Sequence, residues 1–139
     1  MKQLKQAIDV MPEQTGKPKN KLANIKINIL PDQMADASYL DQEDFKDRKV
    51  EYERGGFGFV GVQAEAEIQV PFGAQWSDNK WTIHHISSPG LWGIESDMDN
   101  EYLEEVAREE VDQLKDQLEA LNVDISNFDE LAEQAIADL

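Results

Sequence analysis

Residues 57–70 read FGFVGVQAEAEIQV, and apolar side chains alternate with polar ones along most of this segment. The even-numbered positions from Val60 to Val70 are apolar, whereas the odd-numbered positions on the other side begin with Phe59 and then carry Gly, Gln or Glu from Gly61 to Gln69. This period of two is typical of a β-strand with one face buried and the other in water. The segment therefore predicts a half-buried strand, and the neighbouring segments are interpreted from it.

Segments on both sides of this strand also have strand character. Residues 22–30 alternate in part and end at Pro31, with one apolar face formed by Ile25, Ile27 and Ile29. The turn-forming run 76–81 precedes a further strand over residues 80–86, which favours antiparallel pairing with the strand before it. The turn at 88–90 leads to a last short strand over 91–94. We expect an antiparallel sheet of three to four strands.

The carboxyl-terminal third predicts two helices. A long amphipathic helix is expected over residues 100–122, with Asp97 or Asp99 as its N-cap. A helical wheel gathers its apolar side chains into one sector, with Val111 at the edge: Leu103, Val106, Ala107, Leu114, Leu118 and Leu121. A short helix should run from Ser126 through Ala137, with Asp129 completing a capping-box-like start. The predicted class is α+β, with the sheet packed against the long helix.

Length and composition predict one domain. The 139 residues and the hydrophobic fraction of 40% suffice for a single core, so residues 1–139 are expected to form one domain. Residues 1–21, which contain Pro12, Gly16 and Pro18, are expected to form a flexible arm. A short helix is expected within 41–54, after a loop anchored by Tyr39 and Leu40. The absence of cysteine excludes disulfides and thiolate metal sites.

The formal net charge of −16 points to the kind of partner. Such a charge repels phosphates and anionic lipid and attracts basic surfaces. Residues 97–139 hold fifteen acids against two bases, Arg108 and Lys115. No apolar run of membrane-spanning length or signal-like start occurs, so a cytoplasmic protein is expected. We expect no direct contact with nucleic acid or membrane and a protein partner that carries a basic groove; a homodimer stays open.

Six acids of the long helix fall within about 80° of one another on the side opposite its apolar sector: Glu101, Glu105, Glu109, Asp112, Asp116 and Glu119. They extend over about 27 Å, a linear charge density within about a factor of two of a DNA strand. Asp97 and Asp99 could extend this surface at one end. Our hypothesis is that the six acids, hereafter the acidic stripe, imitate phosphates and occupy a basic DNA- or RNA-binding groove.

Other function classes are weighed beside this one. The acids could serve solubility alone, with partner binding through the sheet face that carries glycines and Trp92, as in an accessory or assembly protein. A small enzyme could use His84 or His85, but adjacent strand positions point to opposite faces, which predicts one buried and one exposed imidazole. Neither a catalytic triad nor a complete calcium loop is present, so we predict no enzyme, metal or cofactor.

Several segments resemble one pattern: RGGFGFVGVQAEAE at 54–67, IHHISSPGLWGIESD at 83–97, YLEEVA at 102–107 and Ser38-Tyr39-Leu40. This pattern is similar to that of an uncharacterised family of small acidic proteins of phages, prophages and plasmids. The resemblance implies a mobile-element origin and assigns no catalytic residue. Small acidic proteins of such elements often inhibit host enzymes, which suggests a CRISPR effector or a restriction or repair nuclease as the target. The expected role is thus that of an anti-CRISPR or anti-restriction inhibitor acting in the host cytoplasm.

Overall fold

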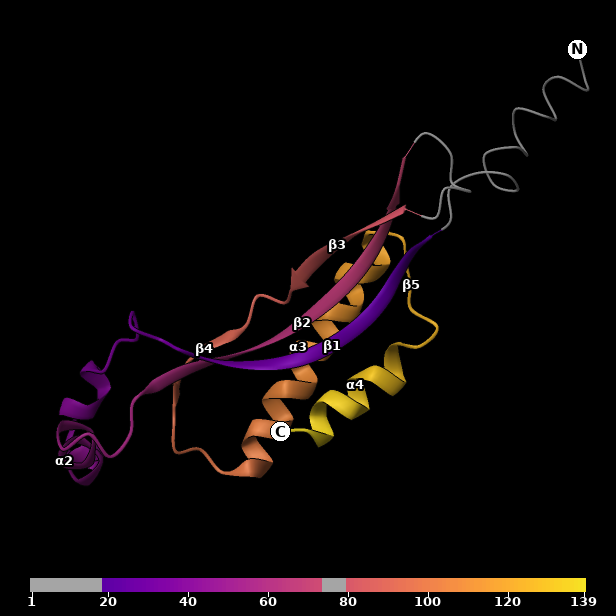
Figure 1. The fold of residues 1–139 in the computed structure, drawn as a ribbon. Helices are drawn as coiled ribbons and strands as arrows, with labels where there is room; N and C mark the ends of the chain where they lie inside the picture. The colour runs from indigo at the N-terminus through magenta and orange to yellow at the C-terminus, as the bar shows by residue number, and fades with distance from the viewer. Residues whose placement is uncertain (1–18, 74–79) are drawn as a thin grey trace, which may run out of the picture.

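The computed structural model describes residues 19–73 and 80–139, and their fold is mixed α+β (Figure 1). The elements, in chain order, are β1 (Asn20–Pro31), the short 3-10 helices η1 (Ser38–Asp41) and η2 (Glu43–Phe45), α2 (Lys46–Glu53), β2 (Phe59–Phe72), β3 (Lys80–Ser87), β4 (Leu91–Glu95), α3 (Asn100–Ala120), β5 (Val123–Asp124) and α4 (Phe128–Ala137). The predicted α+β class with a long carboxyl-terminal helix is confirmed.

The predicted arm and turn fall largely outside the described residues. Most of the arm expected over 1–21 lies there, as do residues 76–79 of the turn expected at 76–81. Because β1 begins at Asn20, the last two residues of the expected arm belong to the sheet.

The sheet is built around β2. This strand pairs antiparallel with β1 along one edge and with β3 along the other. Beyond the end of β3, β4 continues along the same edge of β2, also antiparallel. The two residues of β5 pair parallel with β1, so the sheet is mixed and the purely antiparallel arrangement expected from the sequence was wrong in this detail. The reason is that α3 returns the chain to the free edge of β1, and β5 then runs along that edge in the same direction as β1.

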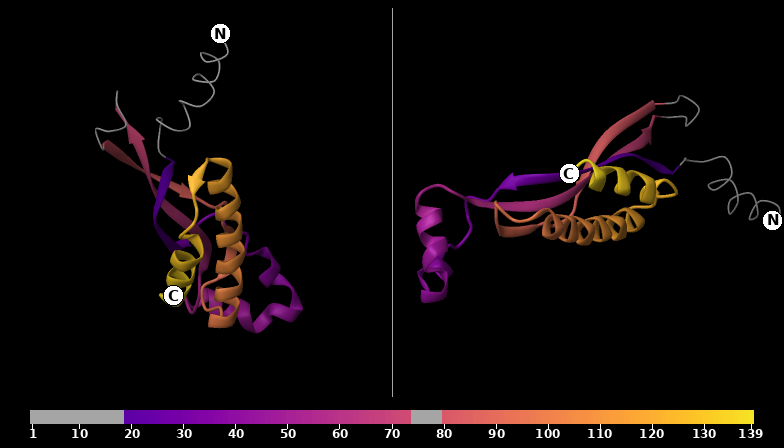
Figure 2. Two further views of the ribbon diagram at one scale, coloured as in Figure 1. Left: turned by 90° about the vertical axis from the view of Figure 1, so that its right-hand side faces the viewer. Right: turned by 90° about the horizontal axis from the view of Figure 1, so that it is seen from below.

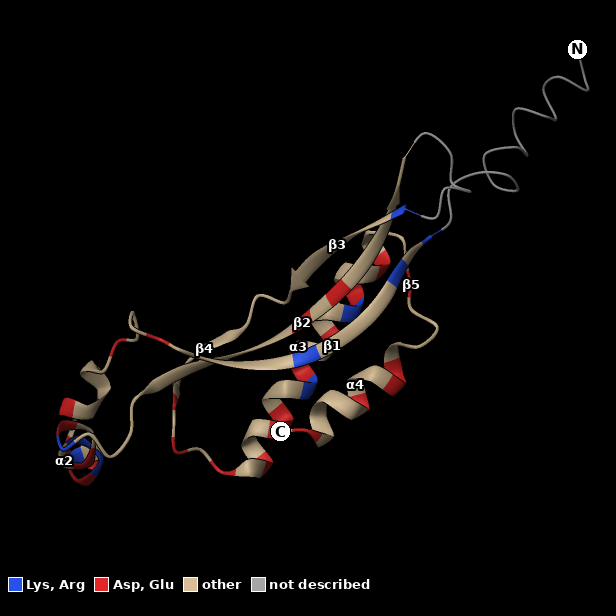
Figure 3. Cartoon of the chain, viewed as in Figure 1, with Lys and Arg blue, Asp and Glu red and all other residues tan. Residues whose placement is uncertain are grey.

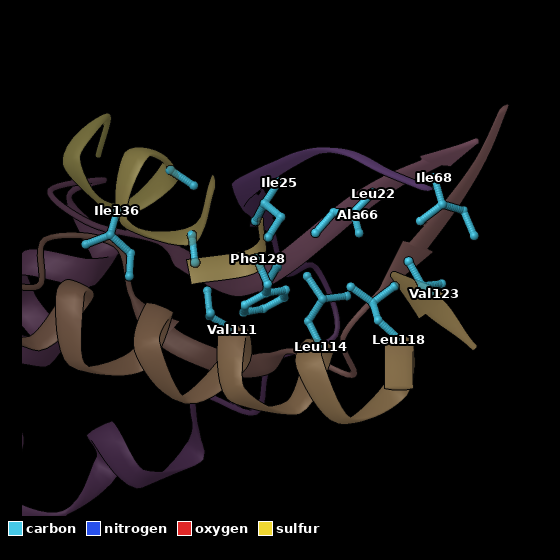
Figure 4. Close-up of a cluster of buried hydrophobic side chains, with 13 residues drawn as sticks. Leu22, Ile25, Ala66, Ile68, Val111, Leu114, Leu118, Val123, Phe128 and Ile136 are labelled. Atoms are coloured by element: carbon cyan, nitrogen blue, oxygen red, sulfur yellow. The ribbon is translucent and has the colours of Figure 1, made fainter. Parts of the chain in front are cut away.

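Both carboxyl-terminal helices lie on one face of the curled sheet (Figure 2). The buried face of β2 includes Val62, Ala64, Ala66 and Ile68, which are at most 4% exposed, so the predicted alternation is confirmed over this span. Against them pack the inner side of α3 and residues of β1, β5 and α4 (Figure 4). The short alanine side chains of β2 leave room for Leu114 and Leu118, both fully buried.

Some positions depart from the predicted burial. Ile29 of β1 was expected on the buried face but is 46% exposed. Leu121 was expected in the apolar sector but is 47% exposed, because α3 ends at Ala120 and Leu121 is its C-cap. The predicted anchor Leu40 is only 2% exposed and packs with Phe57 and Phe59. Phe59 was expected on the wet face of its strand but is only 9% exposed, because it packs in that cluster. Burial thus follows the predicted pattern only where another element covers the predicted face.

The start of α4 also differs from the prediction. The capping arrangement of Ser126 with Asp129 was wrong, since the N-cap is Asn127 and makes no side-chain capping hydrogen bond. The Ser126 backbone N–H instead donates to Asp124 Oδ1 at 3.0 Å. This turn lowers the pKa of Asp124, because hydrogen bonds from Ser126 favour the ionised carboxylate.

We predict that Leu114→Ala lowers the free energy of unfolding by about 2–5 kcal/mol, because it leaves a cavity between α3 and β2. Leu121→Ala removes the same atoms from an exposed position and should lower it by well under about 1 kcal/mol. Urea unfolding followed by circular dichroism measures both values. Equal losses would contradict the described packing of α3.

Candidate functional site

The acidic stripe belongs to α3, a helix in which Figure 3 shows many acidic positions. All six side chains, Glu101, Glu105, Glu109, Asp112, Asp116 and Glu119, are exposed. Among the described residues, none of the six takes part in an ion pair. The stripe is therefore a row of carboxylates that the fold leaves without counterions in its described part.

The two bases of α3 face α4. Arg108 contacts Glu133 at 2.8 Å and Glu104 at 2.9 Å, and Lys115 lies 3.6 Å from Asp129. The Arg108 guanidinium lowers the pKa of Glu133, mainly through their hydrogen bond. On the helix surface both bases thus neutralise acids beside the stripe rather than acids within it.

Asp97 and Asp99, which could extend the stripe, have different environments. Asp99 is the N-cap of α3 and accepts a hydrogen bond from the Tyr102 backbone N–H at 2.7 Å. Asp97 binds the Arg48 guanidinium at 2.8 and 2.9 Å, and this contact lowers the pKa of Asp97. Arg48 also binds Glu95 at 2.9 Å. Because Asp97 already has an internal counterion in Arg48, Asp99 is the better extension of the stripe.

Strand pairing along one edge of β2 is interrupted twice, first between the end of β3 and the start of β4 and again within β4. Ser88 still pairs with Ala64: its N–H donates to the Ala64 carbonyl at 2.8 Å, and its Oγ accepts from the Ala64 N–H at 2.9 Å. Gly90 and Gly93 then have φ values of +87° and +74°, which favour glycine. The register shift between Val60 and Val62 fits β-bulges at this edge.

A buried acid of α3 holds the segment that joins β3 to β4. Glu110 is 3% exposed, and its Oε1 accepts hydrogen bonds from Ser88 Oγ at 2.8 Å and from the Gly90 N–H at 2.6 Å. Sequence reasoning missed this residue. The available signal was its place on the helical wheel, where it is an acid in the middle of the apolar sector. Its role is to tie α3 to the start of β4.

Trp92 lies within the stretch of β4 where the register shifts, and its side chain is fixed by its surroundings. The indole lies against Gly61, where an added Cβ would collide with Cε3 of the ring. Its Nε1–H donates to the Pro89 carbonyl at 3.0 Å, yet the side chain is 43% exposed. It borders an open hollow of about 720 Å³, the aromatic hollow, lined by Tyr39, Arg48, Leu91, Trp92, Gly93, Ile94, Glu95, Asp97, Met98, Asp99 and Tyr102.

The histidines do not form a site. His84 and His85 are both exposed, so the expected burial of one imidazole was wrong. The reason is that β3 is at the edge of the sheet. His85 Nδ1 lies 3.7 Å from Glu65 Oε1 on the face opposite the helices. In residues 19–73 and 80–139, no group of three or more His, Asp or Glu side chains is placed to hold a metal ion.

Comparisons with known proteins give no relative. No family model matches the chain, and no curated protein or solved structure matches it. Within the described part of the chain, no helix is both long and apolar enough to cross a membrane.

We predict that Glu110→Ala lowers the free energy of unfolding by about 1–3 kcal/mol, because Ser88 Oγ and the Gly90 N–H lose their acceptor. Glu110→Gln retains a carbonyl acceptor and should cost less. The matched control is Glu109→Ala on the exposed side of the same helix, which should leave stability nearly unchanged. Denaturant unfolding compares the three variants, and a loss for Glu109→Ala as large as that for Glu110→Ala would contradict the assignment.

The Arg48–Asp97 pair predicts a pH dependence. The pKa of Asp97 in the folded protein is below its ordinary value of 3.8, so its contribution to stability is present above that value and is lost as pH falls through the lowered pKa. The difference in unfolding free energy between the wild type and Asp97→Asn should therefore be larger at about pH 7 than at about pH 3. In an Arg48→Gln background this pH dependence should disappear. A difference that grows on acidification would contradict it.

Proposed function

We propose that this chain is a non-catalytic inhibitor that occupies the basic nucleic-acid-binding groove of a partner protein with the acidic stripe of α3. One observation carries the proposal: six exposed carboxylates share one helix face without described counterions, while Arg108 and Lys115 face α4. An acidic face that served solubility alone would not require Arg108 and Lys115 to lie outside the stripe, where they pair with acids of α4.

The rigidity of α3 supports this function. Val106, Leu114 and Leu118 fix the inner side of the helix in the core, so the outward direction of the carboxylates is set before any partner binds. Their separation along the axis is about 4.5–6 Å, against about 3.4 Å per phosphate in one DNA strand. Because the charges are preorganised, binding loses little conformational entropy in the helix.

The class of partner follows from charge and from the resemblance to mobile-element proteins. A groove that binds DNA or RNA carries lysine and arginine side chains spaced for phosphates, which the stripe can contact instead. Host defence enzymes such as CRISPR effectors and restriction or repair nucleases have such grooves and are the targets that we propose.

A second candidate function has its own observation. The exposed Trp92 beside the aromatic hollow is typical of an interface anchor, which would suit an accessory or assembly protein. In that case Trp92→Ala would reduce partner binding more than charge reversal on α3.

The test is affinity capture from host lysate on the immobilised protein, followed by elution with duplex DNA or single-stranded RNA. We expect a nucleic-acid-binding enzyme to be retained at low salt, displaced by one of the competitors, and lost as salt rises. Reversal of Glu105, Asp112 and Asp116 to Lys should abolish the capture, because it replaces three central carboxylates of the stripe by cations.

The matched control reverses three exposed acids near α2: Asp44, Asp47 and Glu53. Both triple variants bring the formal charge from −16 to about −10, so only the position of the charges differs. The control variant should retain the capture. Equal loss in both variants would show that net charge suffices, and undiminished capture by the stripe variant would refute the proposal.

A further inference from the structure

We propose that the aromatic hollow binds an arginine side chain of a protein partner. The inference rests on the proposed function only for the origin of that arginine, which would lie at the rim of the same basic groove. The chemistry of the hollow stands on the contacts of its own residues.

The hollow offers aromatic and apolar surface at its wall. Trp92, Tyr102 and Leu91 line it and are 43%, 42% and 39% exposed. Trp92 has little freedom to withdraw, because its ring lies against Gly61 and its Nε1–H is bonded to Pro89. A planar guanidinium stacks on the face of an indole or phenol ring, and its aliphatic stem packs on leucine.

The hollow is also negatively charged. Glu95, Asp97 and Asp99 line it together with a single base, Arg48, which leaves an excess of two negative charges. Glu95 and Asp97 both bind Arg48. Asp99 accepts one hydrogen bond as the N-cap of α3 and has no ion pair among the described residues. A cationic ligand is therefore favoured over an anionic or purely apolar one.

Arg48 shows that this kind of surface holds a guanidinium. Its Cζ lies 3.9 Å from the centre of the Phe57 ring while its nitrogens bind Asp97 and Glu95. Aromatic stacking together with carboxylate contacts is the arrangement that distinguishes arginine from lysine, whose compact ammonium lacks a planar face. Two exposed rings, Trp92 and Tyr102, and the exposed carboxylate of Asp99 line the hollow, so it offers both groups to a further guanidinium.

The hollow also adjoins the acidic stripe. Tyr102 lines the hollow, and its neighbour Glu101 is the first carboxylate of the stripe. One partner could thus place an arginine in the hollow and further bases along α3. The stripe would supply long-range attraction, and the hollow would supply selectivity for one arginine.

The experiment titrates the full chain with the peptide acetyl-Gly-Arg-Gly-Gly-amide and follows indole N–H signals by ¹H–¹⁵N NMR. Trp92→Phe identifies the signal of Trp92. We expect a saturable shift of this signal at millimolar arginine peptide, a response at least about fivefold weaker for the lysine peptide, and none for the uncharged citrulline peptide. Tyr102→Ala should weaken the arginine response about threefold or more while leaving the Trp92 signal in place.

The stripe variant with Glu105, Asp112 and Asp116 reversed to Lys separates this inference from the proposed function. It should lose partner capture but retain a selective shift of Trp92 with the arginine peptide. An equal response to citrulline, no response at Trp92, or loss of selectivity in the stripe variant would overturn the inference. A selective response of the wild type, together with failure of the wild type to capture a nucleic-acid-binding enzyme, would refute the proposed function alone.

Discussion

The packing of α3 against β2 is the contact on which the rest of the molecule depends. Ala64 and Ala66 present a shallow surface, and Leu114 and Leu118 fill it. Once these side chains are buried, the rotation of α3 about its own axis is fixed. Because the carboxylates lie opposite the leucines on the helical wheel, the same contact points the acidic stripe outward.

The aromatic hollow depends on the same helix through different atoms. Glu110 reaches from α3 to Ser88 and Gly90, where the edge strand departs from regular pairing with β2. That departure lets Trp92 lie against Gly61 instead of following the regular alternation of a strand. The inner side of α3 therefore positions both candidate surfaces, one by burying leucines and the other by anchoring the segment between β3 and β4.

The sequence predicted what local periodicity encodes. The strand over β2, the extent of α3 and the exposure of the six acids of the stripe follow from periods of two and 3.6 residues. The sequence did not reveal the contacts between distant segments. Arg48 and Asp97 are 49 residues apart, Glu110 and Ser88 are 22 apart, and the parallel pairing of β5 with β1 depends on where α3 ends. No periodic pattern records such pairings, although an acid within an apolar sector marks a residue that needs a buried partner.

α3 tolerates its row of like charges because the free energy gained by burying its leucines exceeds the repulsion between the carboxylates. Like charges four residues apart destabilise a helix by about 0.2–0.5 kcal/mol per pair. The stripe has three such pairs, 101/105, 105/109 and 112/116, so their repulsion amounts to about 0.6–1.5 kcal/mol. Full burial of one leucine contributes about 1.5–3 kcal/mol, and Leu114 and Leu118 are both fully buried. The helix can therefore carry a row of carboxylates that have no ion pair among the described residues without losing its place on the sheet. A basic partner would relieve that repulsion on binding, which makes the same unfavourable term a source of affinity.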